Sequence, residues 1–243
     1  MIYKAIVAYD GWNYAGWQKQ VNAVGIQEVI EKALFKINRK ETRIIASGRT
    51  DAKVHAWGQV FHFVPMDSMS PHAYFQALNT VLPKDIRIQS IEKVPDSFHA
   101  RFSVQSKRYD FICTTNAKDP FAYRYKQLVW QNLDIDLMKM ASKYLLGTHD
   151  FTSFCSSRVE ADKPKVKTIT KIEIRVEGQD IRTIFEGTGF LRYQVRMMMG
   201  TLIEVGKHKL EPVDVKKILE AKNKEACRYN AQPQGLYLMK VNY

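Results

Sequence analysis

The residues best equipped for chemistry lie in one short stretch, Ser47 to Ala56, which reads Ser-Gly-Arg-Thr-Asp-Ala-Lys-Val-His-Ala. It joins two predicted strands, Thr42 to Ala46 and Trp57 to Val64, where a plain hairpin would need little more than Asn-Gly or Asp-Gly. A neighbouring arginine lowers the pKa of a carboxyl group, and an ionised carboxylate is a candidate nucleophile. The residue types alone leave a second explanation open, a purely structural pair between Arg49 and Asp51.

Several common catalytic sites have no counterpart in the sequence. Asp51 is the only acid in its stretch, so hydrolysis by paired carboxylates has no local support. Phosphate-loop, dinucleotide-binding and serine-nucleophile motifs are all missing. The cysteines, Cys113, Cys155 and Cys227, lie far apart and form no Cys-x-x-Cys pair. This spacing argues against a zinc site and a disulfide framework, and the expected location is a reducing cytoplasm.

The chain is strongly basic. Its 37 lysines and arginines outnumber 25 aspartates and glutamates, which gives a net charge of +12. Such an excess favours a polyanionic partner, most often nucleic acid, although a merely soluble basic protein shares this composition. The N-terminus turns polar too soon for a signal peptide, and no apolar run approaches about 18 residues. We therefore expect neither a signal peptide nor a membrane span.

The first hundred residues alternate between strand and helix patterns. Ile2 to Tyr9 is apolar on both faces, which predicts a central strand. Apolar residues at helical spacing predict a helix from about Gln27 to Arg39, and Ser70 before Pro71 is typical of a second helix start. With the two strands beside the Asp51 stretch and another over Ile86–Ile91, the predicted order is β-α-β-β-α-β.

The second half repeats this order. Its expected elements are a strand over Phe102–Thr115, a helix over Leu137–Leu145 closed by Gly147, strands over Lys165–Val176 and Ile181–Phe185, a helix ending near Gly206, a helix opened by Pro212 and a strand over Gly235–Val241. Two such units predict an α+β protein with similar ferredoxin-like or RRM-like halves that share a mainly antiparallel sheet. The expected boundary near Val94–Ala100 gives halves 1–98 and 99–243.

The motifs of the Asp51 stretch resemble a known signature. Gly48 to Ala52, followed by Val54-His55-Ala56 and Gly58-Gln59-Val60, is similar to that of the tRNA pseudouridine synthase A family. The similarity covers essentially the whole chain. Further matching segments are Tyr3–Trp17, Phe98–Phe102, Lys107–Tyr109, His149–Phe151, Gly189–Leu191, Val195–Arg196 and Gly235–Leu238.

This resemblance implies an enzyme that isomerises uridine to pseudouridine in the tRNA anticodon stem-loop, at tRNA positions 38, 39 and 40. It implies an active-site cleft between the two halves, no cofactor, no metal and a homodimer that binds tRNA. Three other cations, Lys53, Arg101 and Arg108, are expected to contact the substrate. Lys107, Arg124 and Lys126 are further candidates, because like Arg101 and Arg108 they flank Tyr109 in sequence. Other candidates for phosphate contacts, with a solvated strand face as the alternative, are Lys163, Lys165, Lys167, Lys171, Arg175, Lys207, His208 and Lys209.

The same resemblance assigns roles to five residues. Asp51 is the nucleophile, either by attack at C1′ or by promoting a glycal through loss of the C2′ proton. Arg49 holds Asp51 and occupies the place of the extruded base, while Arg196 pairs with the aspartate. Tyr109 stacks on the uracil and is a candidate base for the C5 proton, and Leu238 forms an apolar wall. Taken alone, these last three would count as ordinary core or surface residues.

Some positions depart from the family pattern. Lys53 stands where the family usually has glycine, and a positive φ there would cost a lysine about 1–2 kcal/mol. The runs Phe190–Gln194 and Met197–Met199 also differ. These departures leave two hypotheses, a catalytic member and a non-catalytic RNA-binding paralogue on the same scaffold. A deaminase is disfavoured because its His/Cys/Cys zinc set is missing.

Overall fold

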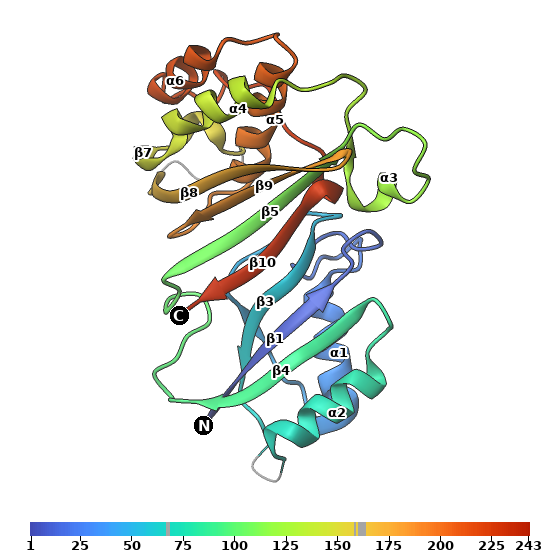
Figure 1. The fold of residues 1–243 in the computed structure, drawn as a ribbon. Helices are drawn as coiled ribbons and strands as arrows, with labels where there is room; N and C mark the ends of the chain where they lie inside the picture. The colour runs from blue at the N-terminus through green and yellow to red at the C-terminus, as the bar shows by residue number, and fades with distance from the viewer. Residues whose placement is uncertain (67–68, 158, 160–163) are drawn as a thin grey trace. The chain divides into compact units, whose positions relative to one another are not determined.

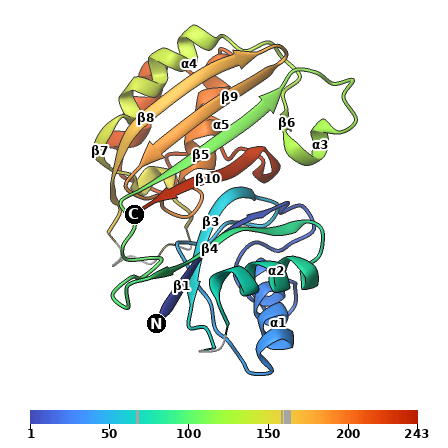
Figure 2. The same cartoon turned by 60° about the horizontal axis from the view of Figure 1, so that its bottom comes forward.

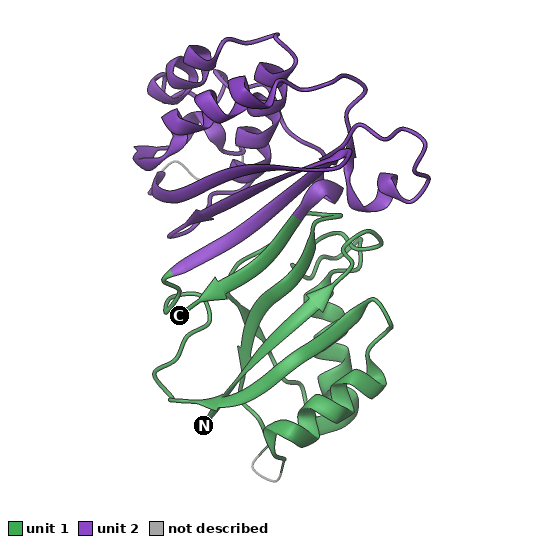
Figure 3. Cartoon of the chain, in the orientation of Figure 1, with its two compact units in different colours: residues 1–105, 237–243 green, residues 106–236 purple. Residues whose placement is uncertain are grey.

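The chain divides into two compact units. The computed structural model describes residues 1–66, 69–157, 159 and 164–243. Unit 1 comprises Met1–Gln105 and Tyr237–Tyr243, and unit 2 comprises Ser106–Leu236 (Figures 1 and 3). Each unit combines helices with a mainly antiparallel sheet, which confirms the predicted α+β class. In the part of the chain that the structure describes, no helix has the length and apolar character needed to cross a bilayer.

Unit 1 has the predicted β-α-β-β-α-β order. Its elements are β1 (Ile2–Tyr9), α1 (Ile26–Asn38), β2 (Ile45–Ala46), β3 (His55–Phe63), α2 (Pro71–Val81), β4 (Ile86–Val94) and, from the end of the chain, β10 (Leu236–Asn242). The strands lie in the order β4-β1-β3-β10, and β2 also pairs with β3. β1 is therefore central, as its two apolar faces predict.

The two helices of unit 1 lie on one face of its sheet (Figure 2). α1 buries the apolar stripe that its spacing predicts, and α2 buries Tyr74 and Leu78. The Ser70 hydroxyl accepts a hydrogen bond from the N–H of Ala73 at 3.2 Å, and Pro71 occupies the first helical turn. This capping contact confirms the predicted start of α2.

Unit 2 has a four-stranded antiparallel sheet in the order β5-β9-β8-β7, with β6 parallel to β5. Its strands are β5 (Ser106–Thr114), β6 (Gln127–Leu128), β7 (Gly147–Asp150), β8 (Val166–Glu177) and β9 (Asp180–Gly187). Its helices are α3 (Ala122–Tyr125), α4 (Ile135–Ser142), α5 (Gln194–Gly206) and α6 (Pro212–Glu220), with 3₁₀ turns over Lys143–Leu145, Thr152–Phe154 and Pro233–Gly235. α4 packs on α5 and α6, and α5 is buried along most of its length.

The units differ from the predicted halves at both ends of the second half. The first unit extends to Gln105, because the strand expected from Phe102 begins only at Ser106, after a stretch of turns. The last strand returns to unit 1, because β10 pairs in parallel with β3, Tyr237 opposite His55 and Leu238 opposite Ala56. Leu238 therefore belongs to the unit that carries Asp51.

One predicted helix end was also wrong. α4 ends at Ser142 and continues as a single 3₁₀ turn over Lys143–Leu145. Gly147 does not close it, because Leu146 caps the 3₁₀ turn and Gly147 is the first residue of β7, with a φ of 101°. The positive φ that favours glycine is therefore present, but it belongs to the turn that leads into β7 and not to a helix end.

Candidate active site

The predicted reactive stretch is a loop of unit 1 between β2 and β3. β3 already begins at His55, so the loop proper is Ser47–Val54. The side chains of Arg49 and Lys53 are exposed, and that of Asp51 is half-buried. The loop thus presents two cations to solvent on either side of a partly sheltered carboxylate. A pairing of Arg49 with Asp51 stays a prediction.

A tight turn follows the aspartate. The N–H of Val54 donates a hydrogen bond to the carbonyl of Asp51 at 3.2 Å, which closes a four-residue turn. Lys53, the third residue of the turn, has a φ of 65°. Type II turns require a positive φ at this position and favour glycine there. The backbone strain expected at Lys53 is therefore confirmed, at a cost of about 1–2 kcal/mol.

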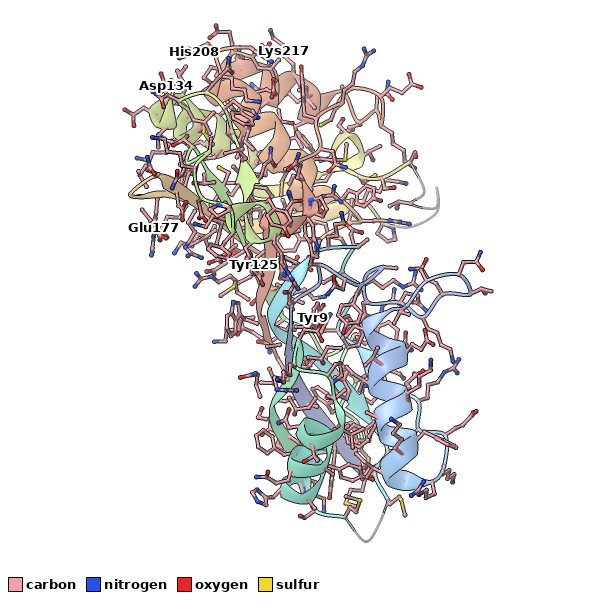
Figure 4. The ribbon with its side chains drawn as sticks, turned by 90° about the vertical axis from the view of Figure 1, so that its right-hand side faces the viewer. Tyr9, Tyr125, Asp134, Glu177, His208 and Lys217 are labelled. Atoms are coloured by element: carbon pink, nitrogen blue, oxygen red, sulfur yellow. The ribbon has the colours of Figure 1, made fainter. Side chains whose placement is uncertain are left out.

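A second loop, Asp10–Trp17, holds the reactive loop through the main chain. The N–H of Trp17 donates to the carbonyl of Thr50 at 3.0 Å, and the N–H of Lys53 donates to the carbonyl of Tyr14 at 3.3 Å. The hydroxyls of Thr50 and Tyr9 share a hydrogen bond of 2.8 Å, with Tyr9 at the end of β1 (Figure 4). Burial raises the pKa of Tyr9, so this phenol stays neutral. Asp51 is therefore fixed from both sides along the chain.

Two glycines allow this close contact between loops. A Cβ on Gly11 would lie 2.0 Å from the carbonyl oxygen of Val54, and one on Gly16 would lie 2.5 Å from that of Thr50. Gly16 also has a φ of 95°, which side chains rarely adopt. Both glycines belong to the Tyr3–Trp17 motif, so the motif specifies the backbone contact that holds the Asp51 loop.

His55 secures the start of β3. Its side chain is buried, and its ring stacks on that of Tyr237 with centroids 4.8 Å apart. The N–H of Gly11 lies 3.1 Å from Nδ1, and Asp10 Oδ1 lies 3.2 Å from the same nitrogen. Asp10 Oδ1 also accepts the N–H of Trp12 at 3.0 Å, so the Asp10 carboxylate links the imidazole to the Asp10–Trp17 loop. Sequence analysis assigned no role to His55, and its only signal was its place in the Val54-His55-Ala56 motif close to Asp51.

Lys53 directs its charge toward an aromatic ring. Its Nζ lies 4.4 Å from the ring centroid of Trp12, within the range of a cation–π contact. Such a contact at an exposed site contributes about 0.5–1 kcal/mol, which offsets part of the backbone strain. The exposed lysine and the half-buried tryptophan together form a positively charged edge where the two loops meet.

Leu238 lies next to this loop through strand pairing. It is opposite Ala56 in the parallel β3–β10 pair and is almost fully buried. A Cβ on Gly58 would meet the carbonyl oxygen of Met239 at 2.3 Å, so this glycine lets β10 approach β3. The predicted apolar wall is therefore in the same unit as Asp51.

Tyr109 and Arg196, the other two predicted catalytic residues, belong to unit 2. Tyr109, on β5, is 8% exposed, and the ring of Phe190 meets its ring edge-on at 5.2 Å and 86°. Arg196 is in the first turn of α5, where its Nε donates to the carbonyl of Ala231 at 2.8 Å. Its guanidinium lies 4.9 Å from the ring centroid of Tyr193. One turn of chain, Phe190–Tyr193, thus contacts both Tyr109 and Arg196.

Arg108 and Arg101 differ in how far they are available to a substrate. Arg108 donates two hydrogen bonds to the buried Asp110, at 2.7 and 2.9 Å, and Asp110 raises the pKa of Arg108. Direct substrate binding by Arg108 stays a prediction, and two of its N–H donors are already bound to this carboxylate. Arg101 is exposed, with its guanidinium 5.6 Å from the ring centroid of Phe102.

Several other candidate cations are also paired with acids. Lys171 and Arg175 both bind Glu173, at 2.8 and 2.6 Å, and they hold the pKa of Glu173 down at about 2, with the hydrogen bond from Arg175 as the largest cause. Other pairs are Lys126 with Asp180, Lys207 and Lys209 with Glu204, and His208 with Asp134 (Figure 4). Lys163 lies outside the described residues.

Metal ligands do not gather in the described part of the chain. Among residues 1–66, 69–157, 159 and 164–243, no three His, Cys, Asp or Glu side chains are placed to hold an ion. The donor set around the Asp51 loop is a carboxylate with cations and aromatic rings. Such a set suits a substrate that is both anionic and aromatic, as nucleic acid is.

Comparison with known proteins gives one consistent result. Residues 5–103 and 141–243 match a family model described as tRNA pseudouridine synthase. A tRNA pseudouridine synthase A of an Exiguobacterium species is 45% identical over 240 residues, covering 99% of this chain and 97% of the relative. Proteins of the same name from Oceanobacillus iheyensis and Listeria monocytogenes are each 44% identical, covering 99% of this chain and 96% and 98% of the relatives.

Proposed function

The chain belongs to the tRNA pseudouridine synthase family, and we propose that its targets are uridines of the tRNA anticodon stem-loop, at tRNA positions 38, 39 and 40. Membership of this family indicates that the chain forms pseudouridine in tRNA. The observation that supports catalysis by this particular chain is the Asp51 loop, whose backbone is held on both sides by Asp10–Trp17. Holding a reactive group in one geometry is itself a large part of catalysis.

The reaction rearranges one nucleotide without gain or loss of atoms. The N1–C1′ bond breaks, the uracil turns, C5 joins C1′, and the proton on C5 leaves while N1 gains one. We propose that the Asp51 carboxylate starts this sequence, either by attack at C1′ or by removing the C2′ proton to give a glycal. No oxidation or group transfer from outside is needed, so the side chains suffice.

The target base must leave its stack before Asp51 can reach the sugar. Base flipping costs a few kcal/mol, and stacking on an aromatic side chain returns about 1–3 kcal/mol. We propose that Tyr109 provides this stacking and removes the C5 proton, with Leu238 as the apolar wall. The exposed guanidinium of Arg49 is accessible to fill the space that the base vacates. Arg196 is proposed to pair with Asp51.

Exposed cations beside aromatic rings are proposed to bind the rest of the substrate. Lys53 over Trp12 and Arg101 over Phe102 each combine a charge for phosphate with a ring for a base or ribose. Arg108 is proposed to act indirectly, by fixing Asp110 next to Tyr109 on β5. We also propose a homodimer in the cytoplasm, where the three cysteines, each buried and without a disulfide, would remain reduced.

A modification map tests the proposed function. The purified protein is incubated with a panel of unmodified tRNAs that carry uridine at positions 38, 39 or 40, and pseudouridine is located by carbodiimide treatment and primer extension. We expect new stops at these positions and none in tRNAs that lack uridine there. Stops confined to another arm would contradict the proposed targets.

The same experiment distinguishes the proposed enzyme from the competing hypothesis. A non-catalytic RNA-binding paralogue would bind these tRNAs and leave no pseudouridine at any position. Binding is measured in parallel at several salt concentrations, because phosphate contacts make affinity fall steeply as salt rises. Tight binding without any modification would favour the paralogue.

A further inference from the structure

The turn between β9 and α5 contains a strained aromatic residue. Tyr193 precedes the first residue of α5 and has a φ of 68°, in the left-handed region that disfavours every residue with a Cβ. Strain of this kind persists only where the surroundings enforce it, and it gathers at functional sites. A glycine or asparagine would adopt this φ more easily. We therefore attribute the tyrosine at this position to a role of its aromatic ring.

The ring of Tyr193 lies close to two guanidinium groups. Arg192 and Arg196 are 5.1 and 4.9 Å from its centroid, and both are within cation–π range. The ring face is negative, so it attracts both cations, which repel one another. Arg196 is also joined to Ala231 twice, since its Nε donates to that carbonyl and its own carbonyl accepts the N–H of Ala231.

The turn itself is anchored at several points. The N–H of Ser156 donates to the carbonyl of Arg192 at 3.0 Å, and the N–H of Met197 donates to that of Tyr193 at 2.8 Å. The N–H of Leu191 donates to Oε1 of the fully buried Gln194 at 2.8 Å. The Tyr193 ring therefore projects from a fixed backbone, which makes it a firm support for the Arg196 side chain.

We infer that Tyr193 is a positioning residue, whose ring holds the Arg196 guanidinium in the orientation needed for pseudouridine formation. This inference rests on the proposed function, because it assigns Arg196 a part in that reaction. The hydroxyl of Tyr193 has no part in it. The ring acts through Arg196 and touches neither substrate nor reacting atoms.

The test compares Tyr193→Leu with Tyr193→Phe in a single-turnover assay on unmodified tRNA. Losing the ring should slow pseudouridine formation about tenfold, the size of a partly desolvated cation–π contact, whereas Tyr193→Phe keeps the ring and stays near wild type. The Kd for tRNA should change less than about twofold in both variants, because the ring makes no contact with RNA. A slow rate with unchanged Kd separates positioning from binding.

Two further variants exclude a general loss of structure. Tyr193→Gly removes the ring and also the backbone strain, so it should be as slow as Tyr193→Leu with a melting temperature no lower than that variant. In an Arg196→Met background, which has no cation to hold, Tyr193→Leu should slow the reaction much less than in the wild type, because residues acting as a unit are not additive.

Three results would overturn the inference. They are a Tyr193→Leu rate equal to wild type, a loss confined to Kd, and an undiminished tenfold loss in the Arg196→Met background. A wild-type protein that forms no pseudouridine would instead overturn the proposed function, and the role of Tyr193 would fall with it.

Discussion

Units 1 and 2 hold their proposed site residues by different physical means. Around Asp51 the contacts are between main chains, with Thr50 and Lys53 bound to the Asp10–Trp17 loop and two glycines that admit no side chain. In unit 2 the contacts are between rings and side chains, with Phe190 against Tyr109 and Tyr193 against Arg196. A contact between main chains cannot adjust through a change of side-chain rotamer. A contact made by an aromatic ring can be kept when another ring is substituted. Unit 1 should therefore fail abruptly under substitution, and unit 2 gradually.

Gly11→Ala should have the largest effect on stability. The new Cβ would lie 2.0 Å from the main-chain oxygen of Val54, so one of the two loops must move. We expect a loss of about 3 kcal/mol in the free energy of unfolding, at the upper end of overpacking costs, measured by urea denaturation. Gly189→Ala is the matched control, because its Cβ would meet nothing within 4 Å. Equal stabilities for the two variants would refute the backbone hold in unit 1.

Phe190→Leu should have a smaller effect, on the rate of reaction. It removes the edge-on contact to Tyr109 but keeps an apolar side chain of similar reach. An edge-to-face pair contributes about 0.5–1.5 kcal/mol, which corresponds to a decrease of roughly 2- to 10-fold in the single-turnover rate. Phe190→Tyr keeps the ring and should match wild type. If both variants were equally slow, ring contact would not be the means of support in unit 2.

Substitution of Lys53 should separate its backbone conformation from its charge. Lys53→Gly relieves the strain of the positive φ, and Lys53→Ala keeps that strain. Both variants remove the ammonium group over Trp12. We expect the glycine variant to be more stable than the alanine variant by about 1 kcal/mol in urea unfolding. If the ammonium contacts phosphate, both variants should lose the same tRNA affinity, and unequal losses would argue against that contact.

His62 should give unit 1 a modest dependence on pH. Its buried Nδ1 accepts the N–H of Ala100 at 3.0 Å, and burial, followed by the charge of His99, lowers the pKa of His62 in the folded protein. At pH values below the pKa of about 6.5 that His62 has in the unfolded chain, the unfolded chain binds the proton more readily than the folded protein does. The free energy of unfolding therefore decreases as pH falls from about 6.5 to the lower pKa of the folded protein. In urea unfolding, the advantage of wild type over His62→Gln should therefore shrink on acidification. An advantage that grows would reverse the sign and contradict the buried neutral imidazole.

Local pattern was enough to predict most of unit 1. Apolar spacing located β1 and α1, and Ser70-Pro71 located the start of α2, because each depends on residues close together in the chain. The return of β10 to β3 was missed, since strand pairing across the whole chain leaves no local signal. The start of β3 at His55 was missed because both faces of that strand are buried, which obscures alternation.

Sequence motifs were enough to propose the candidate site residues, but not the contacts that support them. Gly11 and Gly16 appeared as a motif, but only the structure shows which carbonyls they approach. The pair of Arg108 and Asp110 had a readable signal, because residues two apart on a strand share a face. The contact of Tyr193 with Arg196 joins residues three apart, yet the left-handed turn that creates it is visible only in the backbone.

The most direct test of the account is the single-turnover rate of Asp51→Asn on an unmodified tRNA, with its Kd measured alongside. The change keeps the shape of the side chain and removes only the charge that starts the reaction. We predict a rate at least about 1,000-fold below wild type, as for loss of other nucleophiles, with Kd within about threefold. Asp136→Asn, which alters a carboxylate 92% exposed on α4, should leave both unchanged. An Asp51→Asn protein that retains a tenth or more of the wild-type rate would contradict Asp51 as the catalytic group.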